Sequence, residues 1–150
     1  VCNLRPESRG TIHIKSANPM EPPEIAPNYL SAEADRRVAV RSIQLTRKIM
    51  QAPAMARYSP EEFMPGTEAQ SEEALMKAAG DIGTTIFHPV GTCRMGTDPR
   101  AVVAPDLRVN GVTGLRVVDA SVMPTIVSGN TNSPTLMIAE KAAAMILATE

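Results

Sequence analysis

The chain has 150 residues, a length that suits one domain, and 43% of them are hydrophobic, so it can bury a core. Its 15 basic and 16 acidic residues nearly cancel, which gives no electrostatic reason to expect nucleic acid as a partner. The two cysteines argue against a disulfide framework and favour a reducing, cytoplasmic setting, and no apolar run approaches the roughly 20 residues of a membrane-spanning helix.

The first 30 residues predict a strand followed by an extended connector. Thr11–Ser16 alternates in polarity, with Ile12 and Ile14 on one side, which is typical of a strand. His13 then lies on the other, wetter side. Four prolines between positions 19 and 27 forbid a helix and predict extended chain.

Two helices are predicted in the middle of the chain. Ser31 is expected to cap a helix over Ala32–Met50, with acidic residues in its first turns and basic residues in its last. After an irregular stretch, Ser71 is expected to cap a second helix that ends at Gly80. Apolar residues at helical spacing on the first helix predict a core-facing stripe. That stripe consists of Val38, Ala39, Ile43, Leu45, Thr46, Ile49 and Met50.

Short strands are predicted in the second half of the chain. Thr84–Phe87 and Val102–Val103 are two of them, and two more are expected around the turn signal Asn110-Gly111. The second strand of that pair, Leu115–Val118, is apolar and β-branched, which suits a buried strand.

A third helix is predicted at the end of the chain. Ser133 is expected to cap it, with Pro134 at its first position, and it extends to about Leu147. The helix is apolar almost all round and therefore needs more covering surface than 150 residues easily supply.

His88 is the first candidate for chemistry. It lies in the loop Phe87–Gly96, FHPVGTCRMG, where glycines and prolines form rigid turns. An imidazole held in this way can act as a general base, because its ordinary pKa lies near neutrality. A histidine that merely caps the turn fits the same pattern.

A second candidate is Ser128–Pro134, SGNTNSP, at the start of the last helix. The free N–H groups of a helix N-terminus favour an electron-rich ligand group, although a well-capped helix without a ligand explains the same residues. Asp119 follows the predicted buried strand, where α/β folds hold ligands, but it fits an ordinary turn equally well.

Other chemistries find less support. The cysteines and histidines lack the paired spacing of zinc ligands, so no metal is expected. Ser121 or Ser128 could serve as a nucleophile with His88 and Asp119, yet no G-x-S-x-G motif is present. The glycine-rich dinucleotide and phosphate motifs are also absent.

The FHPVGTCRMG loop followed by LRVNGVTGLRVVDASVMPTIVSGNTNSPTLMIAEKAA resembles the C-terminal region of glucose-methanol-choline (GMC) oxidoreductases, specifically choline-dehydrogenase-like, FAD-dependent alcohol dehydrogenases. LRPESRG and PNYL resemble it too, and the likeness covers almost the whole chain, more loosely over Ile49–Ser71. It implies an α+β fold, with the sheet and helices of a substrate-binding domain in residues 1–96 and the last strand and helix of an FAD-binding domain in residues 97–150.

The resemblance also implies a partner for this chain: an N-terminal FAD-binding portion of the same protein, with its own glycine-rich βαβ unit. Since the chain begins at Val1 rather than methionine, an upstream targeting segment stays open, as does membrane association. These residues alone are expected to be inactive and to expose apolar surface along Leu115–Val118 and the last helix. Without the rest of the protein, the chain is expected to pair with a second copy of itself or to bind no flavin.

The resemblance implies oxidation of a small-molecule alcohol to a carbonyl. His88 would take the hydroxyl proton while hydride leaves for the flavin N5, and Asn132 would hydrogen-bond the substrate oxygen. Choline, aliphatic and aromatic alcohols all remain candidates, as do oxygen and other electron acceptors. The alternatives are a non-catalytic binding or structural module with the same fold and, less favoured, a serine hydrolase. The positions implied to touch FAD are Asp119, Ala120, Gly129, Asn130, Thr131, Asn132, Pro134 and Thr135.

Overall fold

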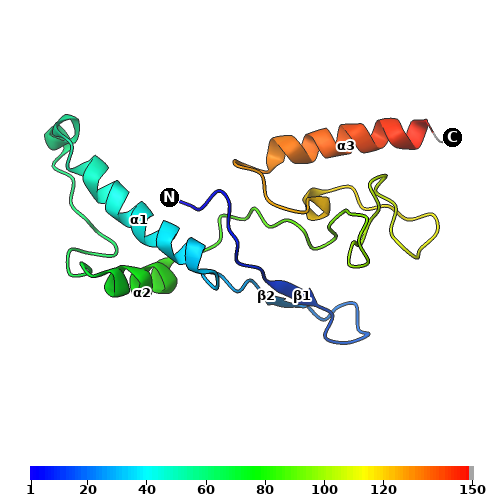
Figure 1. Ribbon diagram of the computed structural model, residues 1–150, viewed down its shortest axis with the longest axis horizontal. Helices are drawn as coiled ribbons and strands as arrows, with labels where there is room; N and C mark the ends of the chain where they lie inside the picture. The colour runs from blue at the N-terminus through cyan, green and yellow to red at the C-terminus, as the bar shows by residue number, and fades with distance from the viewer. Residues whose placement is uncertain (149–150) are drawn as a thin grey trace. The chain divides into compact units, whose positions relative to one another are not determined.

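The computed structural model describes residues 1–148 and divides into two compact units, Val1–Thr85 and Ile86–Glu150 (Figure 1). A small two-stranded sheet combined with helices confirms the predicted α+β class. The division predicted after residue 96 concerns the functional domains of a larger enzyme and stays a prediction. The elements are β1 (Thr11–His13), β2 (Glu24–Ala26), α1 (Glu33–Met50), the 3-10 helix η1 (Pro53–Tyr58), α2 (Glu72–Ile82), the 3-10 helix η2 (Ala120–Val122) and α3 (Asn132–Leu147).

The strand predicted over Thr11–Ser16 exists only in its first half, as β1. It pairs antiparallel with β2, and Ile12 lies opposite Ile25. No strand was predicted at β2, because prolines surround it; in the structure they flank the strand and do not interrupt its pairing. Gly10 permits the close approach of the two segments, since a Cβ there would lie 2.3 Å from the carbonyl oxygen of Ala26.

Helix α1 confirms the first predicted helix, but Ser31 is wrong as its cap. The N-cap is Ala32, which offers no side-chain oxygen, and its own N–H donates to Ser8 Oγ at 3.1 Å. Asp35 in the first turn is only 4% exposed. Hydrogen bonds to the Ser8 hydroxyl and to the Asp35 carboxylate thus tie the N-terminal segment to the start of α1.

The predicted core-facing stripe of α1 is wrong in part. Val38, Leu45 and Ile49 are 37%, 57% and 53% exposed, because among residues 1–85 α1 has a single neighbouring α-helix besides its contacts with the 3-10 helix η1. That neighbour is α2, and Val40 and Leu75 are the buried apolar side chains of the pair.

Helix α2 begins as predicted and ends later than predicted. The Oγ of Ser71 accepts a hydrogen bond from the N–H of Ala74 at 3.1 Å, which confirms the cap. Gly80 does not end the helix, which continues to Ile82. The two further residues include Asp81, which forms an exposed ion pair with Lys77 four residues earlier.

After α2, the predicted strands are wrong or reduced to isolated bridges. Thr84–Phe87 forms no strand. Isolated bridges join Met95 to Val103 and Val103 to Val109, and Arg116 is the only bridged residue of the predicted strand Leu115–Val118. Backbone hydrogen bonds from Val109 to Leu115 at 3.0 Å and from Val117 to Leu107 at 3.1 Å pair the two predicted segments antiparallel, but this pairing is too short to count as strands.

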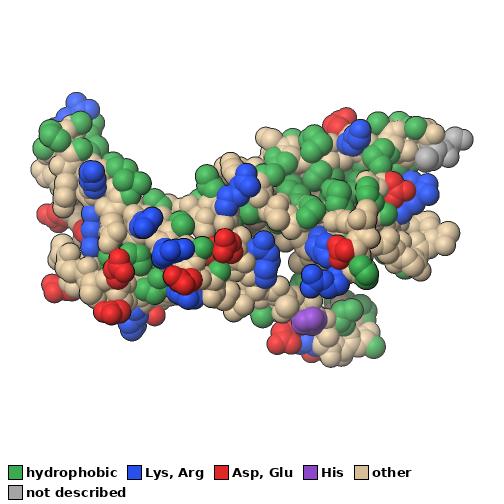
Figure 2. Space-filling model, viewed as in Figure 1, with side chains coloured by type: hydrophobic (Ala, Val, Ile, Leu, Met, Phe, Trp, Pro, Cys, Tyr) green, Lys and Arg blue, Asp and Glu red, His purple; other side chains and the backbone are tan. Residues whose placement is uncertain are grey.

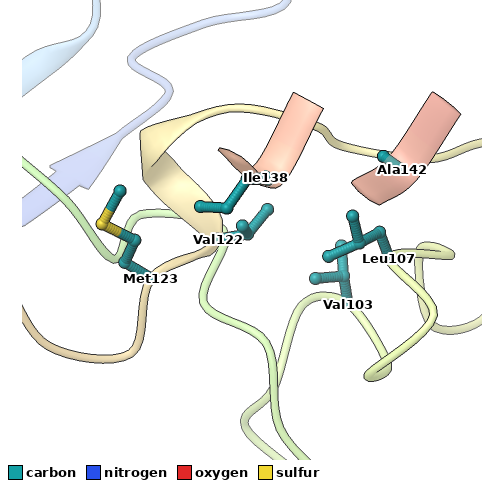
Figure 3. Close-up of a cluster of buried hydrophobic side chains, with 6 residues drawn as sticks. All are labelled: Val103, Leu107, Val122, Met123, Ile138 and Ala142. Atoms are coloured by element: carbon teal, nitrogen blue, oxygen red, sulfur yellow. The ribbon is translucent and has the colours of Figure 1, made fainter. Parts of the chain in front are cut away.

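The core of the second unit joins loops, η2 and α3. Figure 3 shows Ile138 and Ala142 of α3 above the side chains of Val122 and Leu107. Thr131 is the N-cap of α3 and makes no side-chain cap bond, so Ser133 as the cap is wrong. The six side chains of the hydrophobic cluster are Val103, Leu107, Val122, Met123, Ile138 and Ala142.

Apolar surface remains exposed along α3, as predicted. Leu136 and Met137 are 60% and 59% exposed, and Leu115 in the preceding loops is 50% exposed. Figure 2 shows hydrophobic side chains at the surface around this helix. Within residues 1–148, the helices are too short or too polar to cross a membrane.

Candidate active site

The backbone turns sharply immediately before His88. Phe87 has a φ of +62°, a left-handed conformation that is strained for a bulky side chain. His88 precedes Pro89, which restricts it to extended conformations. The half-buried imidazole is thus carried on a stretch of chain with few accessible conformations.

The rest of the His88 loop lies against η2. The N–H of Cys93 donates to the carbonyl oxygen of Ser121 at 3.0 Å, and the N–H of Met95 donates to that of Val122 at 2.8 Å. Val90 and Met95 pack against the hydrophobic cluster. Backbone hydrogen bonds and apolar contacts therefore hold this loop to η2 on both sides of Arg94.

A bidentate ion pair closes the end of the loop. Arg94 Nη1 donates to Asp98 Oδ2 at 2.8 Å, and Nη2 donates to Oδ1 at 2.7 Å. The hydrogen bond from Arg94, together with one from the N–H of Arg100, holds the pKa of the Asp98 carboxyl well below its usual range. The same pairing raises the pKa of Arg94. Both groups therefore stay charged over the whole physiological range.

The N-terminus of α3 carries most of the predicted flavin contacts. Asn132 is the exposed first residue of the helix, whereas Thr131 is only 8% exposed. The carbonyl oxygen of Thr131 accepts hydrogen bonds from the N–H and Oγ1 of Thr135 at 3.0 and 2.6 Å, so these two residues are engaged within the helix itself.

The first amides of α3 fit an electron-rich ligand group. No side chain of the N-cap residue covers them, and Pro134 has no N–H. The N–H groups of Asn132 and Ser133 thus lie at the positive end of the helix dipole without a cap. Gly129 and Asn130 lead into this end, and the N–H of Gly129 donates to the carbonyl oxygen of Val127 at 2.9 Å. The donor set suits the carbonyl-bearing edge of a flavin ring.

Asp119 caps η2. Its Oδ1 accepts hydrogen bonds from the N–H of Ser121 at 2.8 Å and from its Oγ at 2.5 Å. Asp119 thus fits the turn role left open by the sequence, while Ala120 forms the first residue of η2. The Ser121 hydroxyl donates to Asp119 rather than to His88, so Ser121 is not arranged as a nucleophile with His88 as its base.

Two of the predicted site segments converge on η2. The His88 loop donates hydrogen bonds to it, and α3 packs on it, since Val122 and Ile138 belong to one cluster. Among the described residues, no hydrogen bond joins the side chains of His88 and Asn132. Their assignment as a catalytic pair, like the assigned flavin contacts, stays a prediction.

Sequence reasoning missed the residues that support the site. The left-handed Phe87 has no signature in the sequence. Arg94 and Asp98, by contrast, stand four residues apart around Gly96, and opposite charges at that spacing were a readable signal. Within residues 1–148, no group of three or more histidine, cysteine or acidic side chains gathers where it could hold a metal ion.

Comparison with known proteins identifies the family. A model of the C-terminal domain of the GMC oxidoreductases matches residues 6–139, and the chain belongs to this family. It is 50% identical over 147 residues to the alcohol dehydrogenase (acceptor) of Pseudomonas putida, covering 98% of this chain and 27% of that protein. The oxygen-dependent choline dehydrogenase of Escherichia coli is 47% identical over 146 residues, covering 97% and 26%.

Solved structures agree with this assignment. An FAD-dependent oxidoreductase from Chaetomium thermophilum superposes with a TM-score of 0.88 at 32% identity, covering 96% of this chain and 25% of that one. The predicted family and fold class are thereby confirmed, and the neighbour's description supports FAD as the cofactor. The chain spans about a quarter of the length of each of these proteins.

Proposed function

We propose that this chain is the C-terminal catalytic portion of an FAD-dependent enzyme that oxidises an alcohol to a carbonyl compound. The observation that carries the proposal is the shared support of the site: the His88 loop and helix α3 both pack on η2. One short element thus supports a candidate base and a candidate oxygen-binding group. Similarity to proteins named alcohol dehydrogenase and choline dehydrogenase supports the reaction type.

His88 acts as the general base in this proposal. Its imidazole is half-buried and therefore partly accessible. A ring nitrogen can therefore accept the hydroxyl proton of an alcohol as the carbonyl group forms. The rigid backbone at Phe87 and Pro89 limits the positions from which it does so.

Asn132 orients the substrate oxygen. As the exposed first residue of α3, it presents an amide that can donate to or accept from the alcohol oxygen. Holding that oxygen at a fixed place relative to the base lowers the entropic part of the barrier.

FAD, when bound, supplies the hydride acceptor. The uncapped N–H groups of Asn132 and Ser133 would hold its electron-rich edge. The N-terminal portion of the enzyme would contribute the remainder of the cofactor site and cover the exposed apolar side chains of α3. The residues of this chain proposed to contact the cofactor are Asp119, Ala120, Gly129, Asn130, Thr131, Asn132, Pro134 and Thr135.

The test uses the full-length protein with its flavin bound. An alcohol is mixed in without oxygen, and the bleaching of the yellow flavin is followed. Replacement of a general base is expected to slow the bleaching by about 10²- to 10⁴-fold in His88→Ala. His13→Ala is the matched control, because His13 is the only other histidine and lies exposed on β1.

The outcomes separate the candidate functions. An unchanged rate in His88→Ala would remove the proposed base. Bound flavin that no alcohol bleaches, even in the parent protein, would favour the non-catalytic module instead.

A further inference from the structure

We infer that Arg94 and Asp98 are positioning residues for the His88 imidazole, acting by locking the Gly91–Gly96 turn against η2. The inference rests on the proposed function, because it assigns the pair a task only if His88 takes the substrate proton. Neither residue touches the reacting atoms in this account. Their effect reaches His88 through the backbone of one loop.

The ion pair is built over a glycine. A Cβ placed on Gly96 would lie 3.1 Å from Asp98 Oδ2 and 3.3 Å from Arg94 Nη1, and 3.2 Å from the Cβ of Ala101. The two charged side chains thus fill the space directly above the Gly96 backbone. A side chain at this position would push the pair apart.

Backbone hydrogen bonds beside the pair join the loop to the unit's buried core. The backbone carbonyl of Arg94 accepts a hydrogen bond from the N–H of Val102 at 3.0 Å, and the N–H of Gly96 donates to Val103, which is fully buried. On the other side, Asp98 Oδ1 also accepts from the N–H of Arg100 at 3.0 Å. These hydrogen bonds hold the segment around Asp98 and the end of the His88 loop in a fixed position relative to each other.

The connection to His88 is short and stiff. The N–H of Arg94 donates to the carbonyl oxygen of Gly91 at 3.2 Å, which closes the turn. Gly91 has a φ of +89° and lies so close to Met123 that an added Cβ would be 3.3 Å from its carbonyl oxygen. Only Pro89 and Val90 separate this turn from His88, and Val90 packs against the core. A shift of the turn therefore moves the imidazole.

The exposure of the pair argues against a role in overall stability. The Arg94 and Asp98 side chains are 28% and 47% exposed, and ion pairs at such exposure contribute little to the free energy of unfolding. A bidentate guanidinium–carboxylate contact instead fixes geometry, because two parallel hydrogen bonds set both distance and orientation. Loss of the pair should thus lower catalytic rate more than stability.

The experiment uses the full-length, flavin-loaded protein. Arg94→Ala and Asp98→Asn are each expected to lower kcat by about 10- to 100-fold, because small displacements of a catalytic group cost that much. KM, flavin content and the melting temperature should stay near those of the parent. Arg94→Lys keeps the charge without the two-pronged contact and should recover only part of the rate.

A matched control comes from another ion pair of the same unit. Arg108 Nε and Asp106 Oδ2 lie 3.4 Å apart, with side chains 56% and 48% exposed. Asp106→Asn should leave kcat unchanged. Asp98→Asn, which is almost isosteric, remains informative if Arg94→Ala folds poorly.

A double-variant cycle separates positioning from structural damage. If the pair acts through His88, Arg94→Ala should have almost no further effect on the flavin bleaching rate in the His88→Ala protein. Equal losses in both backgrounds would overturn the inference, as would an unchanged kcat in Arg94→Ala and Asp98→Asn. If His88→Ala itself bleaches at the parental rate, the proposed function fails, and the positioning role fails with it.

Discussion

In Val1–Thr85 the most buried charged side chain of the described residues, Asp35, holds the N-terminal segment to α1, whereas in Ile86–Glu150 an apolar cluster joins the loops to α3. The first unit buries only Val40 and Leu75 among its large apolar side chains. Hydrogen bonds accepted by the buried Asp35 carboxylate therefore help to order the first unit, and burial of apolar side chains orders the second. The candidate site lies entirely in the second unit, where packing positions its loops.

Removal of apolar volume from the second unit should have the largest effect on stability. Leu107 is 4% exposed within the hydrophobic cluster (Figure 3). Leu107→Ala should lower the free energy of unfolding by about 2–5 kcal/mol, because it leaves a cavity. Denaturant titration of the purified protein measures the change. Leu107→Met is the matched control, and a loss as large as that of the alanine variant would contradict the packing account.

Loss of the Asp35 carboxylate should have the next largest effect. Its oxygens accept hydrogen bonds from the N–H groups of Glu7 and Ser8 at 2.9 and 2.7 Å. Asn3 Nδ2 donates to it as well, at 2.9 Å. Asp35→Asn places an amide N–H₂ among these donors and should lower the free energy of unfolding by about 1–3 kcal/mol.

The effect of Asp35 should depend on pH. Burial acts to raise the pKa of Asp35, but hydrogen bonds from Ser8 and Glu7 and the charge of Arg9 outweigh it and leave the pKa below the ordinary value of 3.8. Its contribution to stability is therefore present above pH 3.8 and is lost as the pH falls through the lowered pKa. Unfolding titrations of the parent and Asp35→Asn should converge in acid. A difference in the free energy of unfolding between the two proteins that stays constant as the pH falls would contradict the role of the carboxylate.

A smaller, local effect is expected at the end of α1. Arg47 donates to the carbonyl oxygens of Ala69 and Gly66 at 2.8 and 3.0 Å and pairs with Glu62. Hydrogen bonds with Arg47 hold the pKa of Glu62 below its usual value. Arg47→Met should speed hydrogen exchange of the backbone amides over residues 62–70 a few-fold while leaving the second unit unchanged. Exchange followed by mass spectrometry detects this.

The smallest effect is expected from a fully solvated pair. Lys77 and Asp81 form an ion pair on α2 with side chains 78% and 57% exposed. Lys77→Ala should change the melting temperature too little to detect, because solvent and salt screen such pairs. A clear drop in the melting temperature of Lys77→Ala would contradict the expectation that solvated ion pairs contribute little to stability.

The helices could be predicted from the sequence because their signals are local. The Ser71 cap and the periodic apolar residues of Glu33–Met50 depend only on neighbours along the chain. The antiparallel pairing around Asn110-Gly111 could be predicted from the turn signal, but its shortness could not, because an apolar β-branched run does not determine how far a pairing extends. The exposed stripe on α1 has the same cause: periodicity identifies a face, but not what covers it.

The site could be predicted only as far as its motifs reach. His88 and the N-terminus of α3 stand out because a His-Pro loop and a polar helix start carry recognisable chemistry. Their common support by η2 depends on backbone hydrogen bonds between distant segments, such as that from Cys93 to Ser121, which no local pattern encodes. Likewise, the space above Gly96 that the ion pair fills appears only in three dimensions.

The most direct measurement is a crystal structure of the full-length, flavin-loaded protein with an alcohol or its carbonyl product bound. We expect a ring nitrogen of His88 and the amide of Asn132 to lie within about 2.6–3.2 Å of the same substrate oxygen. If that oxygen is instead held by other residues, with the His88 imidazole turned away from it, the proposed proton transfer is contradicted.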